Sequence, residues 1–368
     1  MDGKRAGSKS CRLARENCMT RIAAVRCAFP PHRYPQSTLT DMAARVCLPE
    51  NADRRLLDRL HRNARVDYRN LALPIEQYEK LNGFGAANDA FVSVAVDLGL
   101  ESVKAALDAA ELEPTDVDMI MFTSVTGIAA PSVDARLATA LGLRPDVKRV
   151  PVFGLGCVAG AAGIARIHDY LRGWPDHVAV LLSVELCSLT VQRGDSSPAN
   201  LIASALFGDG AAAVVACGGG RGAAGPTVVA TRSHLYPGSE HVMGWQVGDT
   251  GFRVMLDASV PAVVRRYLAD DVHGFLAEHG VTAGEVTAWV CHPGGPKVLE
   301  AVSDVLGLPA DALDVTWRSL AANGNLSSSS VLHVLGDTLA TRSPEPGTWG
   351  LIIAMGPGFC SELVLIRW

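Results

Sequence analysis

The sequence has no apolar run approaching the roughly 18 residues of a membrane span, so we expect no membrane insertion. It also has no surplus of basic residues, because 33 Lys and Arg stand against 38 Asp and Glu, for a formal net charge of -5. A general attraction to nucleic acid or anionic lipid is therefore not expected. An anionic substrate would need a local patch of cations.

The sequence lacks any Cys-x-x-Cys pair. Its nine cysteines are scattered and odd in number, which argues against a disulfide framework or a zinc cage. We therefore expect a protein of the reducing cytoplasm, with no metal. Residues 1–19 contain several Lys and Arg but no continuous apolar block, which is a poor match to a signal peptide. These residues are predicted to form a flexible N-terminal extension.

The remaining chain has the composition of a large folded protein. Its 368 residues are 48% hydrophobic, which suits two domains or two fused halves. Strand-like and helix-like runs alternate along it, a pattern typical of an α/β fold. Strands are predicted over residues 118–124, 150–153, 178–184, 211–216, 288–291 and 351–355, and helices over residues 94–110, 157–171 and 260–279.

The sequence contains signs of an internal duplication. Residues 106–125 and 275–294 overlie each other without a gap, and each reads as a helix end, a turn, an acidic residue followed by Val, and a buried strand. This register places His292 opposite Thr123, at the end of a strand. We therefore predict an N-terminal half over residues 20–226 and a C-terminal half over residues 227–368.

The similarity continues into the segments that carry the candidate catalytic residues. A Leu-Gly-Leu segment occurs in both halves, and Gly156-Cys157 then corresponds to Gly324-Asn325. Both pairs are predicted where a strand turns into a helix. A pseudo-twofold axis would bring the two helix starts together, close to the strand that ends at His292.

A cysteine at a helix start is a candidate nucleophile. The helix dipole and a nearby imidazole are expected to lower the thiol pKa of Cys157. The alternatives are a buried structural cysteine and, for Asn325, an ordinary helix N-cap. A Cys–His–Asn set supports either a thiol hydrolase or an enzyme that forms carbon–carbon bonds.

Five motifs together resemble the type III polyketide synthases, the chalcone and stilbene synthase family, from about residue 20 to the C-terminus. They are residues 156–160 (GCVAG), 205–211 (ALFGDGA), 292–296 (HPGGP), 324–328 (GNLSS) and 355–359 (MGPGF). The resemblance implies a thiolase-like fold of αβαβα layers built from two duplicated halves. It also implies a homodimer and an acyltransferase that needs no metal or redox cofactor.

The resemblance implies a decarboxylative condensation. Cys157 would take an acyl starter from its CoA thioester, and His292 and Asn325 would form an oxyanion hole. The same pair would hold the enolate formed when malonyl-CoA loses carbon dioxide. The extended chain would then cyclise to an aromatic or pyrone product. A ketoacyl-ACP synthase, a Cys–His thiol hydrolase and a catalytically silent acyl-binding homologue are the rival hypotheses.

The resemblance also implies the substrate-binding residues. Phe207 and Phe252 fall at the two gatekeeper positions of the family. The other predicted substrate-binding residues are Cys187, Thr190, Thr126, Gly244 and Pro357. The residues predicted to bind CoA are Arg55, Arg59, Arg62, Lys297, Gly294 and Gly295, with the four cations directed at its phosphates.

The starter is predicted from small side chains at cavity positions. Ala130, Ala203 and Gly244 would leave room for a long acyl chain. Val125 and Thr190 stand where the malonyl-CoA-only tetrahydroxynaphthalene synthases typically carry Cys. Residues 243–252 look more like those of the bacterial alkylresorcinol and alkylpyrone synthases. The resemblance therefore favours a fatty acyl starter and an alkylresorcinol or alkylpyrone product, with the tetrahydroxynaphthalene type as the alternative.

Overall fold

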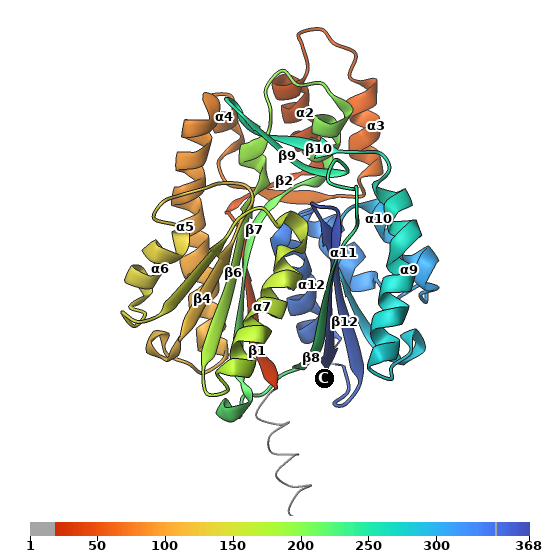
Figure 1. The fold of residues 1–368 in the computed structure, drawn as a ribbon. Coiled ribbons are helices and arrows are strands. Elements are labelled where there is room, and N and C mark those ends of the chain that lie inside the picture. The colour runs from red at the N-terminus through yellow and green to blue at the C-terminus, as the bar shows by residue number, and fades with distance from the viewer. Residues whose placement is uncertain (1–18, 343) are drawn as a thin grey trace, which may run out of the picture.

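The computed structural model describes residues 19–342 and 344–368, so the predicted extension lies outside it except for Met19. The strands are β1 (Thr20–Ala28), β2 (His32–Pro35), β3 (Tyr68–Leu71), β4 (Met119–Thr123), β5 (Lys148–Val152), β6 (Val178–Leu186), β7 (Asp209–Gly218), β8 (Thr227–Leu235), β9 (Met243–Gly248), β10 (Gly251–Leu256), β11 (Val286–Cys291), β12 (Trp349–Gly356) and β13 (Cys360–Arg367). The α-helices are α2 (Gln36–Cys47), α3 (Arg55–Asn63), α4 (Ile75–Tyr78), α5 (Gly83–Ala109), α6 (Val133–Leu141), α7 (Ala159–Gly173), α8 (Pro198–Leu206), α9 (Val260–Glu278), α10 (Pro296–Leu306), α11 (Asp314–Asn323) and α12 (Ser328–Thr341) (Figure 1).

The large sheet has a nearly symmetric strand order. Its order is β11-β12-β13-β8-β1-β7-β6-β4-β5, so β1 and β8 at the centre are flanked by β7 and β13, then β6 and β12, then β4 and β11. Corresponding pairs also run in the same sense: β4–β6 and β11–β12 are parallel, whereas β6–β7 and β12–β13 are antiparallel. Only β5, at one edge, has no counterpart. This order is that of a duplicated unit.

The sheet and helices form five layers, as predicted. The two strand sets join through a short ladder between β1 and β8, with the residue pairs Thr20–Val228 and Arg21–Thr227. Helices α7 and α12 contact each other and strands of both sets, so they form the central layer. Helix α5 covers the outside of one set, and α9 and α10 lie outside the other (Figure 1). The αβαβα architecture expected from the sequence is therefore confirmed.

The repeat detected in the sequence has a local structural cause. Helix α5 ends at Ala109 and α9 at Glu278, which are equivalent positions when residues 106–125 overlie residues 275–294. A 3-10 turn closed by a capping box follows each helix, and its acidic residue supplies the box. The Leu-Gly-Leu segments end α6 and α10, because Gly142 and Gly307 have φ values of +72° and +60°.

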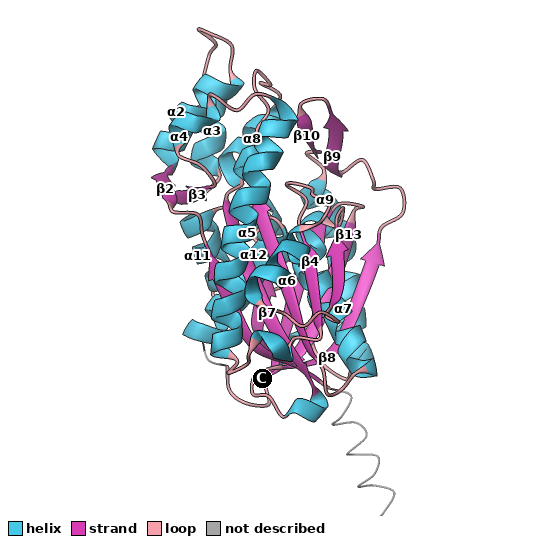
Figure 2. Cartoon of the chain, turned by 90° about the vertical axis from the view of Figure 1, so that its left-hand side faces the viewer, coloured by secondary structure: helices cyan, strands magenta, loops and turns pink. Residues whose placement is uncertain are grey.

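Smaller elements cover one end of the large sheet. The β2–β3 and β9–β10 pairs lie there with helices α2, α3 and α8, as the two views in Figures 1 and 2 show. No helix in the described part of the chain is both long and apolar enough to cross a membrane. The candidate catalytic residues lie between this covering layer and the strand ends.

Candidate active site

Cys157 lies in a 3-10 turn, Gly156–Val158, that leads into α7. The turn needs glycine at position 156, because the φ there is +59° and an added Cβ would lie 2.6 Å from Cδ of Pro357. The helix proper begins at Ala159, two residues later than the sequence predicted. Cys157 is nearly enclosed, with 7% of its surface exposed.

Asn325 is held by its own backbone beside the segment that carries Phe207. Its N–H donates to the carbonyl of Leu206 at 2.8 Å, and its carbonyl accepts from the N–H of Gly208 at 3.0 Å. Its Oδ1 accepts from the N–H of Ser327 at 2.8 Å. In the described part of the chain, its Nδ2 donates to no protein acceptor, so this group is free to bind a substrate oxygen. The N-cap position of α12 is Ser327, so Asn325 does not fill it.

His292 follows the last residue of β11. Its N–H donates to the carbonyl of Ile353 at 2.8 Å, which continues the pairing of β11 with β12. Its side-chain Nδ1 is buried, and the residues that the structure describes offer it no hydrogen-bond partner. Burial lowers the pKa of His292 to about 3, so the imidazole is neutral near pH 7.

The thiol of Cys157 is also neutral in this enclosed site. Burial raises its pKa to about 12, although the hydroxyl of Ser327, 3.7 Å from the sulfur, acts in the opposite direction. The predicted lowering of this pKa is therefore wrong for the resting site, because burial outweighs the hydrogen bonds that lower it. Proton transfer to His292 would form thiolate and imidazolium together, and their attraction would offset part of this penalty.

The three candidate catalytic residues share one cavity. Cys157, His292 and Asn325 all line a cavity of about 340 Å³, whose walls are mostly apolar. Phe207, Met355 and Phe359 also line it, as do Gly294, Gly295 and Lys297. A nucleophile, a proton acceptor and an amide N–H donor thus face a space large enough for a thioester. This arrangement supports acyl transfer.

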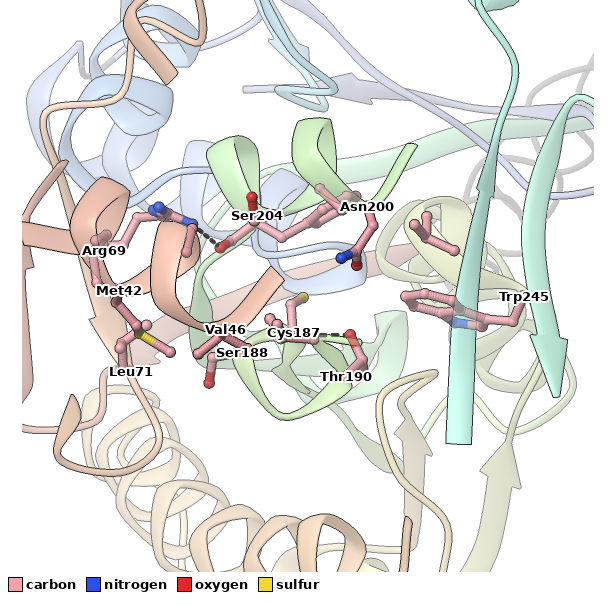
Figure 3. Close-up of a pocket in the computed structure, with 16 residues that line it drawn as sticks. Met42, Val46, Arg69, Leu71, Cys187, Ser188, Thr190, Asn200, Ser204 and Trp245 are labelled. Atoms are coloured by element: carbon pink, nitrogen blue, oxygen red, sulfur yellow. Dashed lines mark hydrogen bonds between the residues drawn. The ribbon is translucent and has the colours of Figure 1, made fainter. Parts of the chain in front are cut away.

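A second, smaller cavity also has Phe207 in its wall, and Figure 3 shows residues that line it. Its volume is about 40 Å³, and its lining includes Cys187, Thr190, Arg69 and Trp245. Phe207 lines both cavities and therefore stands between them. Cys187 and Thr190 line a cavity as the sequence predicted, but it is this smaller one.

Four predicted substrate-binding residues line neither of these two cavities. Phe252 is 3% exposed and packs against Phe84, with ring centroids 5.2 Å apart. Pro357 packs against the turn that carries the candidate nucleophile. Gly244 lies in β9, where the terminal methyl group of a methionine of β10 faces it. Thr126 is buried in a hydrogen-bonded cluster.

That cluster is centred on Glu185, which the sequence analysis did not identify. Oε2 of Glu185 accepts from the hydroxyls of Ser124 and Thr126 and from the N–H of Val125, at 3.0–3.2 Å, while Oε1 accepts from the hydroxyl of Ser328. Burial raises the pKa of this carboxyl group. The cluster ties the end of β6 to the start of α12, next to Asn325. The sequence signal that could have indicated this buried cluster was an acidic residue inside the apolar run 178–186.

The predicted CoA-binding residues divide into two groups. Gly294, Gly295 and Lys297 line the larger cavity. Arg55 hydrogen-bonds to Asp53. Arg59 and Arg62 are exposed on α3, and residues 60, 63 and 64 of the same segment line the larger cavity. The helix therefore lies at the rim of this cavity and carries exposed cations.

Family models and relatives agree with this geometry. Residues 7–220 match the model described as "Chalcone and stilbene synthases, N-terminal domain", and residues 227–368 match the corresponding C-terminal domain. A 1,3,6,8-tetrahydroxynaphthalene synthase from Streptomyces peucetius subsp. caesius is 61% identical over 352 residues, covering 95% of this chain and 93% of the relative.

Solved structures give the same result. The 1,3,6,8-tetrahydroxynaphthalene synthase of Streptomyces coelicolor A3(2), a bacterial type III polyketide synthase, superposes with a TM-score of 0.90 at 32% identity, covering 95% of this chain and 99% of that one. PKS-I from the brown alga Ectocarpus siliculosus also reaches 0.90, at 25% identity, with 95% and 98% covered. The chain therefore belongs to the chalcone and stilbene synthase family of type III polyketide synthases, which are decarboxylative condensing acyltransferases.

Proposed function

We propose that Cys157 carries the growing acyl chain of a type III polyketide synthase and that His292 and Asn325 stabilise the reacting oxygens. The single observation behind this proposal is that the three side chains line one cavity, with Nδ2 of Asn325 free. In the loading step, Cys157 gives its proton to His292 and its sulfur attacks the thioester carbonyl. The CoA thiolate then leaves and takes the proton from His292, which becomes neutral again.

The extension step uses the same donors. Malonyl-CoA loses carbon dioxide, and the enolate oxygen accepts hydrogen bonds from an imidazole N–H of His292 and from Nδ2 of Asn325. The carbanion attacks the thioester on Cys157, whose sulfur leaves, and the longer chain returns to Cys157 for the next cycle. Removal of one such donor is expected to cost about 10²–10³ in rate.

We further propose that malonyl-CoA is both starter and extender, and that the product is a polyhydroxynaphthalene of the kind named for the 61% identical relative. The small cavity supports a short starter. Its volume of about 40 Å³ is room for roughly three water molecules, too little for a fatty tail. Ala203 does line this cavity, but Met42, Val46 and Trp245 occupy the space that small neighbours would have left.

The test is incubation of the purified protein with isotopically labelled malonyl-CoA alone, followed by mass spectrometry. We expect labelled carbon dioxide and an aromatic product whose carbons all come from malonyl units. Free malonate without decarboxylation would favour a thiol hydrolase instead. A strict requirement for acyl carrier protein would favour a ketoacyl synthase. Product formed only when a fatty acyl-CoA is added would restore the alkylresorcinol alternative.

We propose that Arg59, Arg62 and Lys297 attract the phosphates of CoA at the rim of the larger cavity. Lys297 lines this cavity, and the two arginines are exposed on the helix beside it. The Arg59→Glu, Arg62→Glu double variant should raise KM for malonyl-CoA roughly 5-fold or more with little change in kcat. Arg55→Glu is the matched control, because Asp53 already offsets the charge of Arg55. Equal effects of both changes would overturn the assignment.

We propose a homodimer that pairs through the edge of the sheet at β5. Val150, Phe153 and Ile128 are 39%, 50% and 46% exposed there, an unusual group for a free surface. Phe153→Asp should convert the dimer to a monomer in sedimentation velocity, whereas Leu56→Asp, at an exposed apolar residue of α3, should not. A wild-type protein that sediments as a monomer would refute this proposal.

The proposed reaction needs no metal or redox cofactor and takes place in the cytoplasm, where CoA thioesters are made. No group of three or more His, Cys, Asp or Glu that could hold a metal ion occurs among residues 19–342 and 344–368. Activity that survives dialysis against EDTA would support the first point. Loss of activity that zinc or magnesium restores would contradict it.

A further inference from the structure

Arg69, in β3, is a buried cation in the wall of the smaller cavity. It is 4% exposed. Its Nε donates to Oε1 of Gln36 at 3.2 Å, and its Nη1 donates to the carbonyl of Phe207 at 2.7 Å. Both acceptors are uncharged. Across residues 19–342 and 344–368, Arg69 forms no ion pair, and its Nη2 donates to no protein acceptor.

Asp209, the carboxylate that attracts Arg69, already accepts other hydrogen bonds. Its carboxylate accepts from the N–H of Ala72 at 2.6 Å, from the N–H of Ser188 at 2.8 Å and from the hydroxyl of Ser188. Burial lowers the pKa of Arg69 to about 10 despite the attraction of Asp209. A buried charge without a paired partner costs several kcal/mol, which a bound anion would offset.

The position of Arg69 indicates which anion. It is bonded to the carbonyl of Phe207, the residue that stands between the two cavities. Arg69 and Ser204, a residue of α8, both line the smaller cavity (Figure 3). Cys157 lines the cavity on the other side of Phe207, so an acyl group attached to Cys157 would approach the guanidinium past this residue. A volume of about 40 Å³ suits a carboxylate and excludes an alkyl tail.

We propose that Arg69 binds the free carboxylate of a malonyl-derived starter whose other end is the thioester on Cys157. This inference rests on the proposed use of malonyl-CoA as starter. The guanidinium presents N–H groups in a planar fork that matches a carboxylate, and such charge-assisted hydrogen bonds are strong. Arg69 thereby makes the enzyme select a starter with a terminal carboxylate over neutral acyl groups of the same size.

The test is a competition between two starters of nearly equal shape. Malonyl-CoA and isotopically labelled acetoacetyl-CoA differ in that a methyl group replaces a carboxylate oxygen. Mass spectrometry of the products gives the ratio of chains primed by each. This ratio does not depend on how much of a variant is folded, so a general loss of activity leaves it unchanged.

Arg69→Met should lower the malonyl-to-acetoacetyl priming ratio by about 10- to 100-fold, the range expected for loss of a charged hydrogen bond. Arg69→Lys keeps the charge but loses the fork, and should lower the ratio less. Gln36→Glu keeps Arg69 and gives it an internal carboxylate partner, so it should also lower the ratio. Arg33→Met, on the neighbouring strand β2, is the control and should leave the ratio unchanged.

The outcomes separate this inference from the proposed function. A wild-type protein that makes no product from malonyl-CoA alone would refute the malonyl starter itself. A wild-type protein that does make it, with a priming ratio unchanged in Arg69→Met, Arg69→Lys and Gln36→Glu, would refute the role of Arg69 alone. If the Arg69 variants do not fold, the ratio in Gln36→Glu decides.

Discussion

The Gly160→Ala substitution adds one methyl group, which should move Cys157 away from Asn325. Gly160 lies in the first turn of α7, three residues after Cys157, where α7 meets the start of α12. A Cβ built on it lies 2.3 Å from the main-chain oxygen of Ser328 and 2.7 Å from Cγ1 of Val331. Ordinary contact needs about 3.4 Å or more, so the two helices must move apart by about 1 Å.

The loss in the free energy of unfolding caused by Gly160→Ala follows from these distances. One extra methyl group in a packed interior costs about 1–3 kcal/mol, and the upper end applies because a main-chain oxygen cannot rotate away. The better helix propensity of alanine returns about 1 kcal/mol, which leaves a net loss of about 2 kcal/mol. We expect Tm to fall by roughly 3 °C. A 1 Å displacement of reacting groups costs about 10²-fold in rate, so kcat for polyketide formation should fall by that factor.

Gly173→Ala is the matched control, because it changes the same residue type in the same helix. No atom lies within 4 Å of a Cβ built at Gly173. Its Tm should stay the same or rise slightly, with wild-type activity. Thermal melting and product formation from malonyl-CoA are measured on both variants. A Gly160→Ala protein with wild-type Tm and rate would refute the claim that the contact between α7 and α12 sets the active-site geometry.

Three further changes test other parts of the structure. Glu185→Leu leaves four buried donors without their acceptor and should lower the free energy of unfolding by roughly 4 kcal/mol or more, whereas an unchanged urea midpoint would show that the cluster is dispensable. Trp245→Ala enlarges the smaller cavity and should allow hexanoyl-CoA to prime the reaction; equal use of hexanoyl-CoA by the wild type would contradict the size argument. Burial lowers the pKa of His168 to about 4, below the unfolded value of about 6.5. The contribution of neutral His168 to stability is therefore complete above pH 6.5 and is lost as pH falls towards 4. His168→Gln should therefore reduce the slope of stability against pH in this range by about 1.4 kcal/mol per pH unit, and an unchanged slope in urea titrations would show that His168 is protonated in the folded protein.

The sequence predicted the fold and the convergence of Cys157, His292 and Asn325 on one cavity, because the signals for both are local. Gly156 and Gly324 mark sharp turns directly before Cys157 and Asn325, and the repeat relates the two turns to each other. The repeat itself was visible because capping boxes and left-handed glycine caps need particular residues at fixed spacing. His292 followed from the same register, at the end of a buried strand.

The cavities could not be predicted in this way, because segments far apart in the sequence form their walls. Arg69 comes from β3, Cys187 from the turn after β6 and Trp245 from β9. Small residues such as Ala203 therefore did not indicate a large space, since side chains from other elements fill it. The raised pKa of Cys157 was missed for the same reason, because burial of the thiol depends on the whole fold.

The most direct test of the central claim is mass spectrometry of the enzyme during turnover, combined with a Cys157→Ala variant. We predict that the acyl adduct maps to Cys157 alone. We also predict that Cys157→Ala makes no polyketide yet still releases carbon dioxide slowly from malonyl-CoA, because His292 and Asn325 remain. An adduct on another cysteine such as Cys187 or Cys360, or condensation by the Cys157→Ala variant at the wild-type rate, would contradict the account.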